Sequence, residues 1–364
     1  MTAADPLVVV IAGGGTGGHL FPGVAVAREL MRRRPGSRVS FAGTARGLEA
    51  RVVPREGFPL DLIRSAGLKG KSIASRLRGG WLLAPGLLDA WGILSRRRPQ
   101  VVIGVGGYSA GPVVILASLR GIPTLVLEQN ATPGLTNRLL ARWVRGAAVT
   151  YEQTLPFFRG KGFLSGNPVR PEFFDPDSGF EVRGSPSGRV LILGGSQGAH
   201  AINVAMVAAA PELVRSHPGL HIVHQTGERD LAAVVEGYRA SNVDARAESF
   251  LDGVAGEMKQ ADLVICRAGA TTLAELAATG RPAVLVPFPS ASDDHQRKNA
   301  AVLVTAGAAG MIDQRELSGE RLAQTVSGLL GDQARLAAMS ESMRGFARPD
   351  AARVIVDRIL ELAR

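Results

Sequence analysis

The chain has 364 residues, of which 46% are hydrophobic and 20% are charged, a composition that is typical of ordered globular proteins and excludes a disordered chain. The length suits about two domains, and the single cysteine, Cys266, excludes an internal disulfide and fits a reducing compartment. The apolar stretches are interrupted well before the length that a spanning helix needs, and no signal-peptide pattern is found, so we expect a soluble or peripheral protein.

The net charge of +10 is unevenly distributed along the chain. Residues 1–166 contain 22 Lys and Arg against 8 Asp and Glu, a net charge of +14, whereas residues 167–364 have a net charge of −4. This asymmetry indicates that the first half faces an anionic surface, for which nucleic acid and acidic lipid are both candidates.

The first predicted strand ends abruptly in glycine. Residues 7–12 are an apolar, mostly β-branched run, residues 13–18 contain five glycines, and apolar residues at helical spacing follow over 24–31. Glycine allows the backbone to approach a ligand closely, and the start of a helix presents unpaired N–H groups and a positive dipole end. This strand, turn and helix therefore predict an anion-binding site.

A dinucleotide site is the first alternative for this turn. Gly13, Gly15 and Gly18 satisfy the G-x-G-x-x-G pattern, but a dinucleotide site also needs an acidic residue at the end of the second strand. The second predicted strand, residues 38–44, has no acid at its end. The pattern favours a phosphate-bearing ligand of another kind.

A basic and apolar segment follows a short helix predicted over 49–57. Residues 67–72 form a basic loop, and apolar side chains then recur at helical spacing to about residue 88. One interpretation is a pair of helices with a buried face. The other is an element at a membrane interface, where cations meet headgroups and apolar side chains enter lipid, through Lys69, Lys71, Ile73, Leu77 and Trp81.

The second glycine turn follows the predicted strand at 101–105 and contains Gly106, Gly107 and Tyr108. A further strand, 124–127, ends in the polar residues Glu128, Gln129 and Asn130. Ligands of doubly wound folds bind at the carboxyl ends of the strands, so this edge is a candidate binding edge. The pattern then becomes loop-like around residue 166, which predicts a domain boundary.

The second half repeats the same plan. It contains predicted strands at 189–193, 221–225, 261–266 and 282–287, glycine turns at 194–199 and 267–276, a polar loop at 290–299 and a terminal helix at 351–363. Two similar α/β halves with two glycine turns each imply a ligand held in a cleft between them.

Several of these motifs together resemble the MurG family of peptidoglycan glycosyltransferases, in order along essentially the whole chain. They are the turn at 13–19 with Pro22, Gly106 to Tyr108, Glu128 to Asn130, and residues 166–170, 194–199 and 266–270 with Glu275. The resemblance implies the GT-B architecture, an α/β fold of two Rossmann-like domains whose parallel sheets face each other across a cleft. It also implies an N-terminal acceptor and membrane-docking domain (1–166), a C-terminal UDP-sugar domain (167–345) and a terminal helix (346–364) that packs back on the first domain.

The activity that the resemblance implies is transfer of N-acetylglucosamine (GlcNAc) from UDP-GlcNAc to the 4-hydroxyl of the N-acetylmuramoyl sugar of lipid I, with inversion, to give lipid II. The acceptor is expected at Gly106, Gly107 and Tyr108, and Asn299 is a further candidate for sensing sugar hydroxyls. Contacts to the nucleotide sugar fall on Thr16, Gly17, Gly18, Asn130, Arg170, Ser196, Leu251, Ala270, Thr271, Thr272, Leu273, Ala274, Glu275 and Gln296.

The displacement needs a base for the incoming hydroxyl and positive character near the leaving diphosphate. His19 is the first candidate base, because a helix N-terminus disfavours imidazolium and keeps the ring able to accept a proton. Glu128 is the second candidate, and a capping or phosphate-contacting role for His19 is the alternative. We expect no catalytic metal and no other cofactor, since no Asp-x-Asp ends a strand and 293–295 lacks ligand spacing.

The expected partners are UDP-GlcNAc, lipid I and an anionic membrane surface, with no nucleic acid. The resemblance implies a peripheral protein on the cytoplasmic face of the bacterial plasma membrane. Two other enzyme classes remain as alternatives: a UDP-GlcNAc 2-epimerase, which shares a two-domain fold, and a dinucleotide-dependent oxidoreductase.

Overall fold

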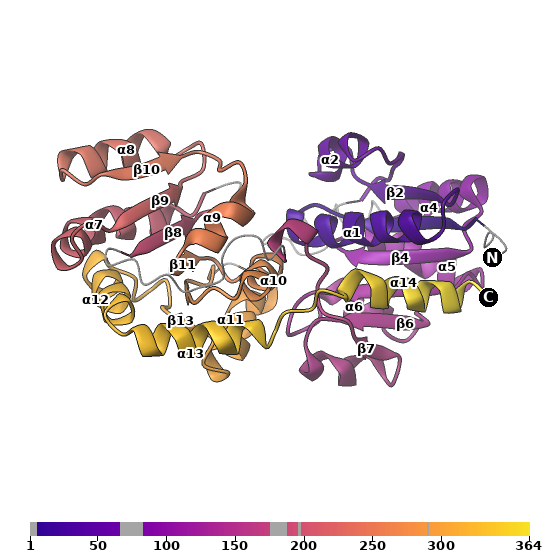
Figure 1. Ribbon diagram of the computed structural model, residues 1–364. Coiled ribbons are helices and arrows are strands. Elements are labelled where there is room, and N and C mark those ends of the chain that lie inside the picture. The colour runs from indigo at the N-terminus through magenta and orange to yellow at the C-terminus, as the bar shows by residue number, and fades with distance from the viewer. Residues whose placement is uncertain (1–5, 66–82, 175–187, 196–197, 290) are drawn as a thin grey trace. The chain divides into compact units, whose positions relative to one another are not determined.

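The computed structural model describes residues 6–65, 83–174, 188–195, 198–289 and 291–364 (Figure 1). The chain forms two compact units. The N-terminal unit consists of Met1–Val169 together with Arg348–Arg364, and the C-terminal unit consists of Arg170–Ala347. The last helix of the chain therefore belongs to the N-terminal unit.

The N-terminal unit is built on a seven-stranded sheet whose neighbouring strands are all parallel, in the order β3-β2-β1-β4-β5-β6-β7. Val10 of β1 pairs with Ser40 on one side and with Val102 on the other. The strands are β1 (Val8–Gly13), β2 (Arg38–Gly43), β3 (Leu60–Leu62), β4 (Val101–Gly106), β5 (Thr124–Glu128), β6 (Gly146–Val149) and β7 (Gly162–Leu164).

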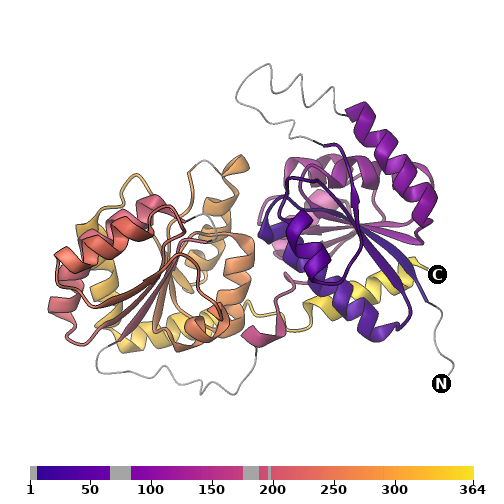
Figure 2. The ribbon, with the colours of Figure 1, turned by 90° about the horizontal axis from the view of Figure 1, so that it is seen from above.

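Helices cover both faces of this sheet, as Figure 2 shows from above. The β-branched strands are buried on both sides, which is why they read as continuous apolar runs. One core contains side chains of α1, α2 and α14, and the other contains side chains of α4, α5 and α6. The helices are α1 (Gly17–Arg33), α2 (Glu49–Arg55), α4 (Leu83–Arg97), α5 (Ala110–Leu119), α6 (Leu135–Leu140) and α14 (Ala351–Leu362), with 3-10 helix η1 (Glu152–Phe158).

The C-terminal unit has a six-stranded parallel sheet in the order β10-β9-β8-β11-β12-β13. The strands are β8 (Arg189–Leu193), β9 (His221–Gln225), β10 (Ala245–Glu248), β11 (Leu263–Cys266), β12 (Ala283–Leu285) and β13 (Ala309–Met311).

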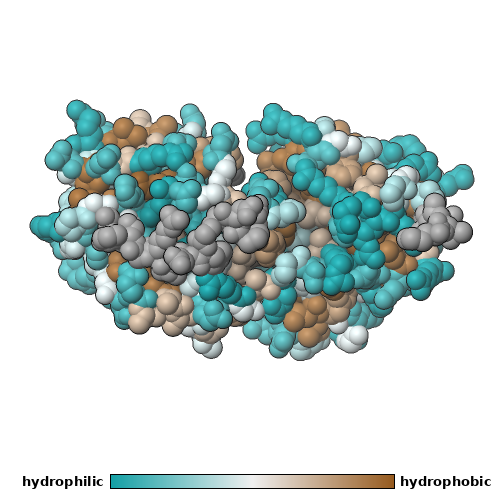
Figure 3. Space-filling view, in the orientation of Figure 1, coloured by the Kyte–Doolittle hydropathy of each residue, from teal (hydrophilic) through white to brown (hydrophobic). Residues whose placement is uncertain are grey.

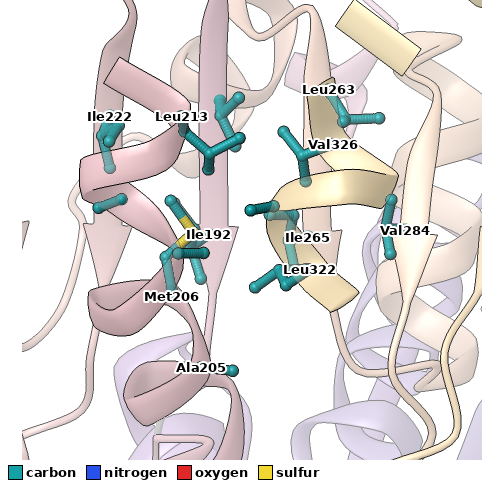
Figure 4. Close-up of a cluster of buried hydrophobic side chains, with 14 of the residues drawn as sticks. Ile192, Ala205, Met206, Leu213, Ile222, Leu263, Ile265, Val284, Leu322 and Val326 are labelled. Atoms are coloured by element: carbon teal, nitrogen blue, oxygen red, sulfur yellow. The ribbon is translucent and has the colours of Figure 1, made fainter. Parts of the chain in front are cut away.

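The core on one face of this sheet is formed by strand side chains such as Ile192 and Ile265 packed against Met206 of α7 and Val326 of α12 (Figure 4). On the remaining side, α9 contacts both β8 and α10. The helices are α7 (His200–Ser216), α8 (Leu231–Ala240), α9 (Val254–Gln260), α10 (Ala270–Thr279), α11 (His295–Thr305), α12 (Gly319–Leu330) and α13 (Gln333–Arg344), with 3-10 helices η2 (Pro171–Phe173) and η3 (Ser292–Asp294).

Both sheets change direction of winding at their centre, between β1 and β4 in one unit and between β8 and β11 in the other. Such switch points leave a crevice at the carboxyl ends of the strands, where doubly wound folds bind ligands. The four glycine turns predicted from the sequence follow these four strands. The predicted α/β fold of two Rossmann-like domains is therefore confirmed.

One local prediction is wrong. The polar residues at 290–299 were expected to form a loop, but η3 and α11 begin within this stretch, at Ser292 and His295. The buried face of α11 is provided by Asn299, Ala300 and Leu303, and the first of these is polar. A helix whose first turn exposes only polar residues lacks the apolar periodicity on which the prediction depends.

Candidate functional site

The first glycine turn, between β1 and α1, uses a backbone conformation that only glycine adopts readily. Gly13, Gly14 and Gly15 have φ angles of 138°, 140° and 86°. The Gly14 N–H donates to the Gly106 carbonyl at 3.3 Å, so the first and second glycine turns are joined directly.

His19 lies in the first turn of α1, beside the second glycine turn. Its Nδ1 is 3.4 Å from Thr16 Oγ1, and the Thr16 carbonyl accepts the His19 N–H at 3.2 Å. A methyl group on Gly106 would lie 2.7 Å from His19 Cδ2, so the imidazole packs directly on the glycine backbone. Tyr108, two residues further, is 43% exposed. The structure thus brings Thr16, His19 and Gly106 together at the carboxyl ends of β1 and β4.

Glu128, at the end of β5, is buried and already occupied by donors of its own chain. Its Oε1 accepts from the backbone and side-chain nitrogens of Asn130, at 3.0 and 3.1 Å. Its Oε2 accepts from the Gly134 N–H at 3.0 Å and from Asn137 Nδ2 at 2.9 Å. Burial raises the pKa of this carboxyl group, and these hydrogen bonds oppose the shift. Four donors hold both oxygens, so Glu128 shapes the loop that carries Asn130.

Glu49 is a buried acid of the first unit that the sequence analysis missed. Its carboxylate accepts hydrogen bonds from the Gly15 N–H at 2.7 Å and from the Thr44 N–H at 2.8 Å. The dinucleotide pattern places its acid at the end of β2, whereas Glu49 lies beyond that strand, at the first residue of α2. A dinucleotide's ribose requires an open carboxylate near this strand end, whereas Glu49 is fully buried and bonded to its own chain.

Glu275 is the central acid of the C-terminal unit. It lies on α10, its side chain is 17% exposed, and its Oε1 is 4.0 Å from Arg170 Nη2. Burial raises the pKa of Glu275 to about 7, and the neighbouring Arg170 guanidinium opposes the shift. Arg170 also pairs with Glu172 at 2.8 Å and lies over the Phe173 ring. A carboxylate and a guanidinium therefore lie side by side, and such groups can form charge-assisted hydrogen bonds to hydroxyl and phosphate groups.

The first turn of α10 presents mainly backbone to a ligand. Ala270 and Leu273 are buried, whereas Thr271, Thr272 and Ala274 are partly exposed. The helix begins after Gly269, and its first N–H groups are those that an anion can use. The predicted contact Leu251 has a buried side chain, so only its backbone is suited to touch a ligand.

In the glycine turn after β8, the described residues leave free space beside Gly195. Gly195 has a φ of 73°, and a methyl group built on it would meet nothing within 4 Å. The Gly194 N–H donates to the Gln225 carbonyl at 3.0 Å, which ties this turn to β9. The predicted contact Ser196 lies outside the described residues.

Gln296 and Asn299 lie on α11 and are bonded to neighbouring loops. Gln296 Oε1 accepts from the Phe288 N–H at 2.9 Å. Asn299 is fully buried, and its Nδ2 donates to the Ala268 carbonyl at 3.3 Å. Asn299 therefore connects α11 to the turn that precedes α10, and this position differs from the exposed loop expected for it.

A buried polar network supports the C-terminal unit near the same edge and was not predicted. His224 Nδ1 is 2.7 Å from the Tyr238 hydroxyl, and its Nε2 is 3.0 Å from Asn203 Oδ1. Asn203 Nδ2 donates to the Thr226 carbonyl and to Asp230 Oδ2, both at 2.9 Å. Burial lowers the pKa of His224 to about 4, so the ring is neutral at neutral pH.

The predicted membrane-docking residues, Lys69, Lys71, Ile73, Leu77 and Trp81, all lie outside the described residues. In the described ranges, no helix combines the length and the hydropathy needed to cross a bilayer. The same ranges contain no cluster of three or more His, Cys, Asp or Glu side chains suited to hold a metal ion.

Comparison with known proteins agrees with this arrangement. Residues 9–149 match the glycosyltransferase family 28 N-terminal domain, and residues 189–355 match the glycosyltransferase family 28 C-terminal domain. A protein of Pelobacter propionicus named UDP-N-acetylglucosamine--N-acetylmuramyl-(pentapeptide) pyrophosphoryl-undecaprenol N-acetylglucosamine transferase is 47% identical over 97% of this chain and 98% of its own length.

Two solved structures bear on the fold. The crystal structure of Acinetobacter baumannii MurG superimposes with a TM-score of 0.81 at 32% identity, covering 98% of this chain and 100% of that one. A putative UDP-N-acetylglucosamine 2-epimerase from Listeria monocytogenes has a TM-score of 0.68 at 14% identity, covering 98% of this chain and 96% of that one, which is a likeness of fold alone.

The two Rossmann-like domains, together with the matches to both family 28 domains, identify a GT-B glycosyltransferase. The identity to its curated relatives extends over nearly the full length of the chain. The chain belongs to glycosyltransferase family 28 and, within it, to the MurG enzymes.

Proposed function

We propose that this enzyme transfers GlcNAc from UDP-GlcNAc to the 4-hydroxyl of the N-acetylmuramoyl sugar of lipid I, which gives lipid II. The observation that carries the proposal is the 47% identity to relatives named for this reaction, over 97% of the chain. The glycine turns and charged side chains at both switch points supply groups suited to a sugar diphosphate and to a hydroxyl nucleophile.

The donor binds to the C-terminal unit in this proposal. The Glu275 carboxylate accepts hydrogen bonds from the ribose hydroxyls. The N–H groups at the start of α10 and in the turn after β8 bind the diphosphate. Arg170, 4.0 Å from Glu275, supplies positive charge on the same side. Gln296 and the backbone of Leu251 contribute contacts to the sugar and to the uracil.

The acceptor is activated at the N-terminal unit. His19 accepts the proton of the 4-hydroxyl as the hydroxyl oxygen bonds to the anomeric carbon of GlcNAc. The bond between that carbon and the diphosphate oxygen breaks on the opposite face, UDP leaves with the electron pair, and the configuration inverts. The packing of the ring on Gly106 and the contact to Thr16 Oγ1 fix the direction in which His19 faces.

Docking of the N-terminal unit on an anionic lipid surface is also part of the proposal. The segment predicted for docking runs into α4, where Leu88 is 70% exposed and Trp91 is 55% exposed. The Arg120 guanidinium lies 4.7 Å from the centre of the Trp91 ring. Figure 3 shows the face that carries α1 and α14, on which hydrophobic and hydrophilic residues are mixed, whereas α4 packs on the other face of the sheet. Aromatic and leucine side chains beside cations are suited to an interface with anionic headgroups.

Transfer of labelled GlcNAc from its UDP donor to a lipid I analogue tests the function. The expected product has one added GlcNAc in the inverted configuration, and it forms only when the acceptor is present. Conversion of UDP-GlcNAc to UDP-N-acetylmannosamine without acceptor would instead identify a 2-epimerase and contradict the proposal. Vesicles with and without anionic lipid test the docking separately.

A further inference from the structure

A buried carboxylate that the proposed reaction does not use lies against the first glycine turn. Glu49 is fully buried at the first residue of α2. Its Oε2 accepts from the Gly15 N–H at 2.7 Å, and its Oε1 accepts from the backbone N–H and the hydroxyl of Thr44 at 2.8 and 2.9 Å. Glu49 therefore joins the turn after β1 to the loop after β2.

Glycines make the space that this carboxylate occupies. A methyl group on Gly14 would lie 2.5 Å from Glu49 Oε2, and one on Gly43 would lie 2.5 Å from Glu49 Cγ. A methyl group on Gly47 would also overlap the carboxylate. The backbone thus closes around Glu49, and the contact to Gly15 is part of a fitted site and not a loose surface hydrogen bond.

The first glycine turn depends on such anchors. Its three consecutive glycines, Gly13 to Gly15, all have positive φ angles. Glycine loses more conformational freedom on folding than other residues do, so this turn needs contacts that hold it. The Gly106 carbonyl holds the Gly14 N–H on one side, and Glu49 holds the Gly15 N–H on the other. Among the residues that the structure describes, the N–H groups of Thr16 and Gly17 have no acceptor and are left for a ligand.

We infer that Glu49 is a positioning residue for the transfer reaction. By fixing Gly15, it fixes the start of α1, and with it the direction of His19 and of the open N–H groups of Thr16 and Gly17. It acts through the backbone and does not contact substrate. The inference rests on the proposed function, because it is measured as transfer activity.

Glu49→Gln keeps the size of the side chain but replaces one acceptor oxygen with a donor. In either orientation of the amide, an NH₂ group faces the N–H of Gly15 or of Thr44, and one contact becomes repulsive. We expect kcat to fall about 10-fold to 100-fold, since small displacements of catalytic groups have effects of this size. The KM for UDP-GlcNAc is expected to change by less than kcat does, because most of the expected donor contacts belong to the C-terminal unit.

The matched control is Glu56→Gln. Glu56 follows α2 directly and pairs on the surface with Arg28, so this change removes a carboxylate from the same segment without touching the turn. It is expected to keep the wild-type kcat. Thr44→Val removes only the hydroxyl donor to Glu49 and is expected to reduce kcat by less than Glu49→Gln does. If Glu49→Gln does not fold, Thr44→Val takes its place as the test variant.

A Glu49→Gln enzyme with the wild-type kcat would overturn the inference. So would a loss of kcat accompanied by an equal loss of donor affinity or of folded protein in thermal unfolding, since general destabilisation would then explain it. If the wild-type enzyme shows no transfer at all, the proposed function fails on its own. Amide exchange then tests Glu49 independently: the Gly15 N–H is expected to exchange faster in Glu49→Gln, and equal rates would contradict the inference.

Discussion

The glycine turns after β1 and after β8 follow the same strand, turn and helix pattern, yet the two units use them differently. In the N-terminal unit, the Gly15 N–H is bonded to the buried Glu49, and the His19 ring packs on Gly106. In the C-terminal unit, a methyl group built on Gly195 would meet no described atom within 4 Å apart from its chain neighbours, and Glu275 remains partly exposed beside Arg170. The same backbone motif can therefore be closed by the protein's own carboxylate or left open for a ligand's phosphates.

This contrast follows from the hydrogen-bond donors and the charges that surround each carboxylate. Glu49 has three donors of its own chain within 2.9 Å, so no ligand is needed to complete its hydrogen bonds. Glu275 has one cation at 4.0 Å and a pKa raised to about 7 by burial, so its ionised form lacks full stabilisation. Donors brought by a ligand would supply what Glu275 lacks, which supports the proposal that the C-terminal unit binds the nucleotide and that the N-terminal unit positions the acceptor.

His19→Ala tests the N-terminal half of this division. Removing a general base is expected to lower kcat by about 10²- to 10⁴-fold, and Glu128, the other candidate base, is already held by four donors of its own chain. Steady-state kinetics at saturating UDP-GlcNAc measures the effect. A kcat near the wild-type value would mean that His19 only binds or caps, and the assignment of the base would then be wrong.

Glu275→Gln tests the C-terminal half. Loss of charged hydrogen bonds to ribose is expected to weaken UDP binding by about 10-fold to 100-fold, from the usual contribution of hydrogen bonds to charged groups. Calorimetric titration with UDP measures it. Glu172→Gln is the matched control, since Glu172 also pairs with Arg170 but its side chain is 53% exposed, and this variant is expected to keep UDP affinity. Equal losses in both variants would assign the effect to the Arg170 charge balance and not to ribose binding.

The pKa of Glu275 predicts a pH dependence that the N-terminal turn does not share. The pKa of Glu275 in the free enzyme is about 7, so the ionised carboxylate, which accepts hydrogen bonds from the ribose hydroxyls, is the minor form at pH 6. UDP affinity is therefore expected to rise about tenfold between pH 6 and pH 8. Titrations at several pH values should show this slope in the wild type and none in Glu275→Gln. A slope that persists in the variant would place the titrating group elsewhere.

The smallest effect concerns stability and the buried His224. In the unfolded chain the ring takes up a proton near pH 6.5, whereas in the folded unit it remains neutral down to about pH 4. The stability present above pH 6.5 is therefore lost as the pH falls, by roughly 1 kcal/mol at pH 5.5. Thermal unfolding of His224→Gln is expected to show a smaller decrease over this interval than the wild type does. An equal decrease would exclude His224 as the cause.

Much of this fold could be predicted from the sequence because its signals are local. Apolar strands such as 101–105 end in glycine, helices follow directly, and this pattern requires no knowledge of distant contacts. The helix at His295 was missed because its first turn is polar and its buried face includes Asn299. Glu49 was missed because its partner Gly15 is 34 residues away, and only the pairing of β1 with β2 brings them together. The His224 network depends in the same way on packing of α7 and α8 near β9.

The division of labour between the units is tested most directly by titrating UDP-GlcNAc into the wild type, His19→Ala and Glu275→Gln. The account predicts that His19→Ala binds the donor as tightly as the wild type does, although it transfers poorly, and that Glu275→Gln binds weakly. Loss of donor affinity in His19→Ala as large as the loss in Glu275→Gln would contradict it, because His19 would then serve the nucleotide and not the acceptor hydroxyl.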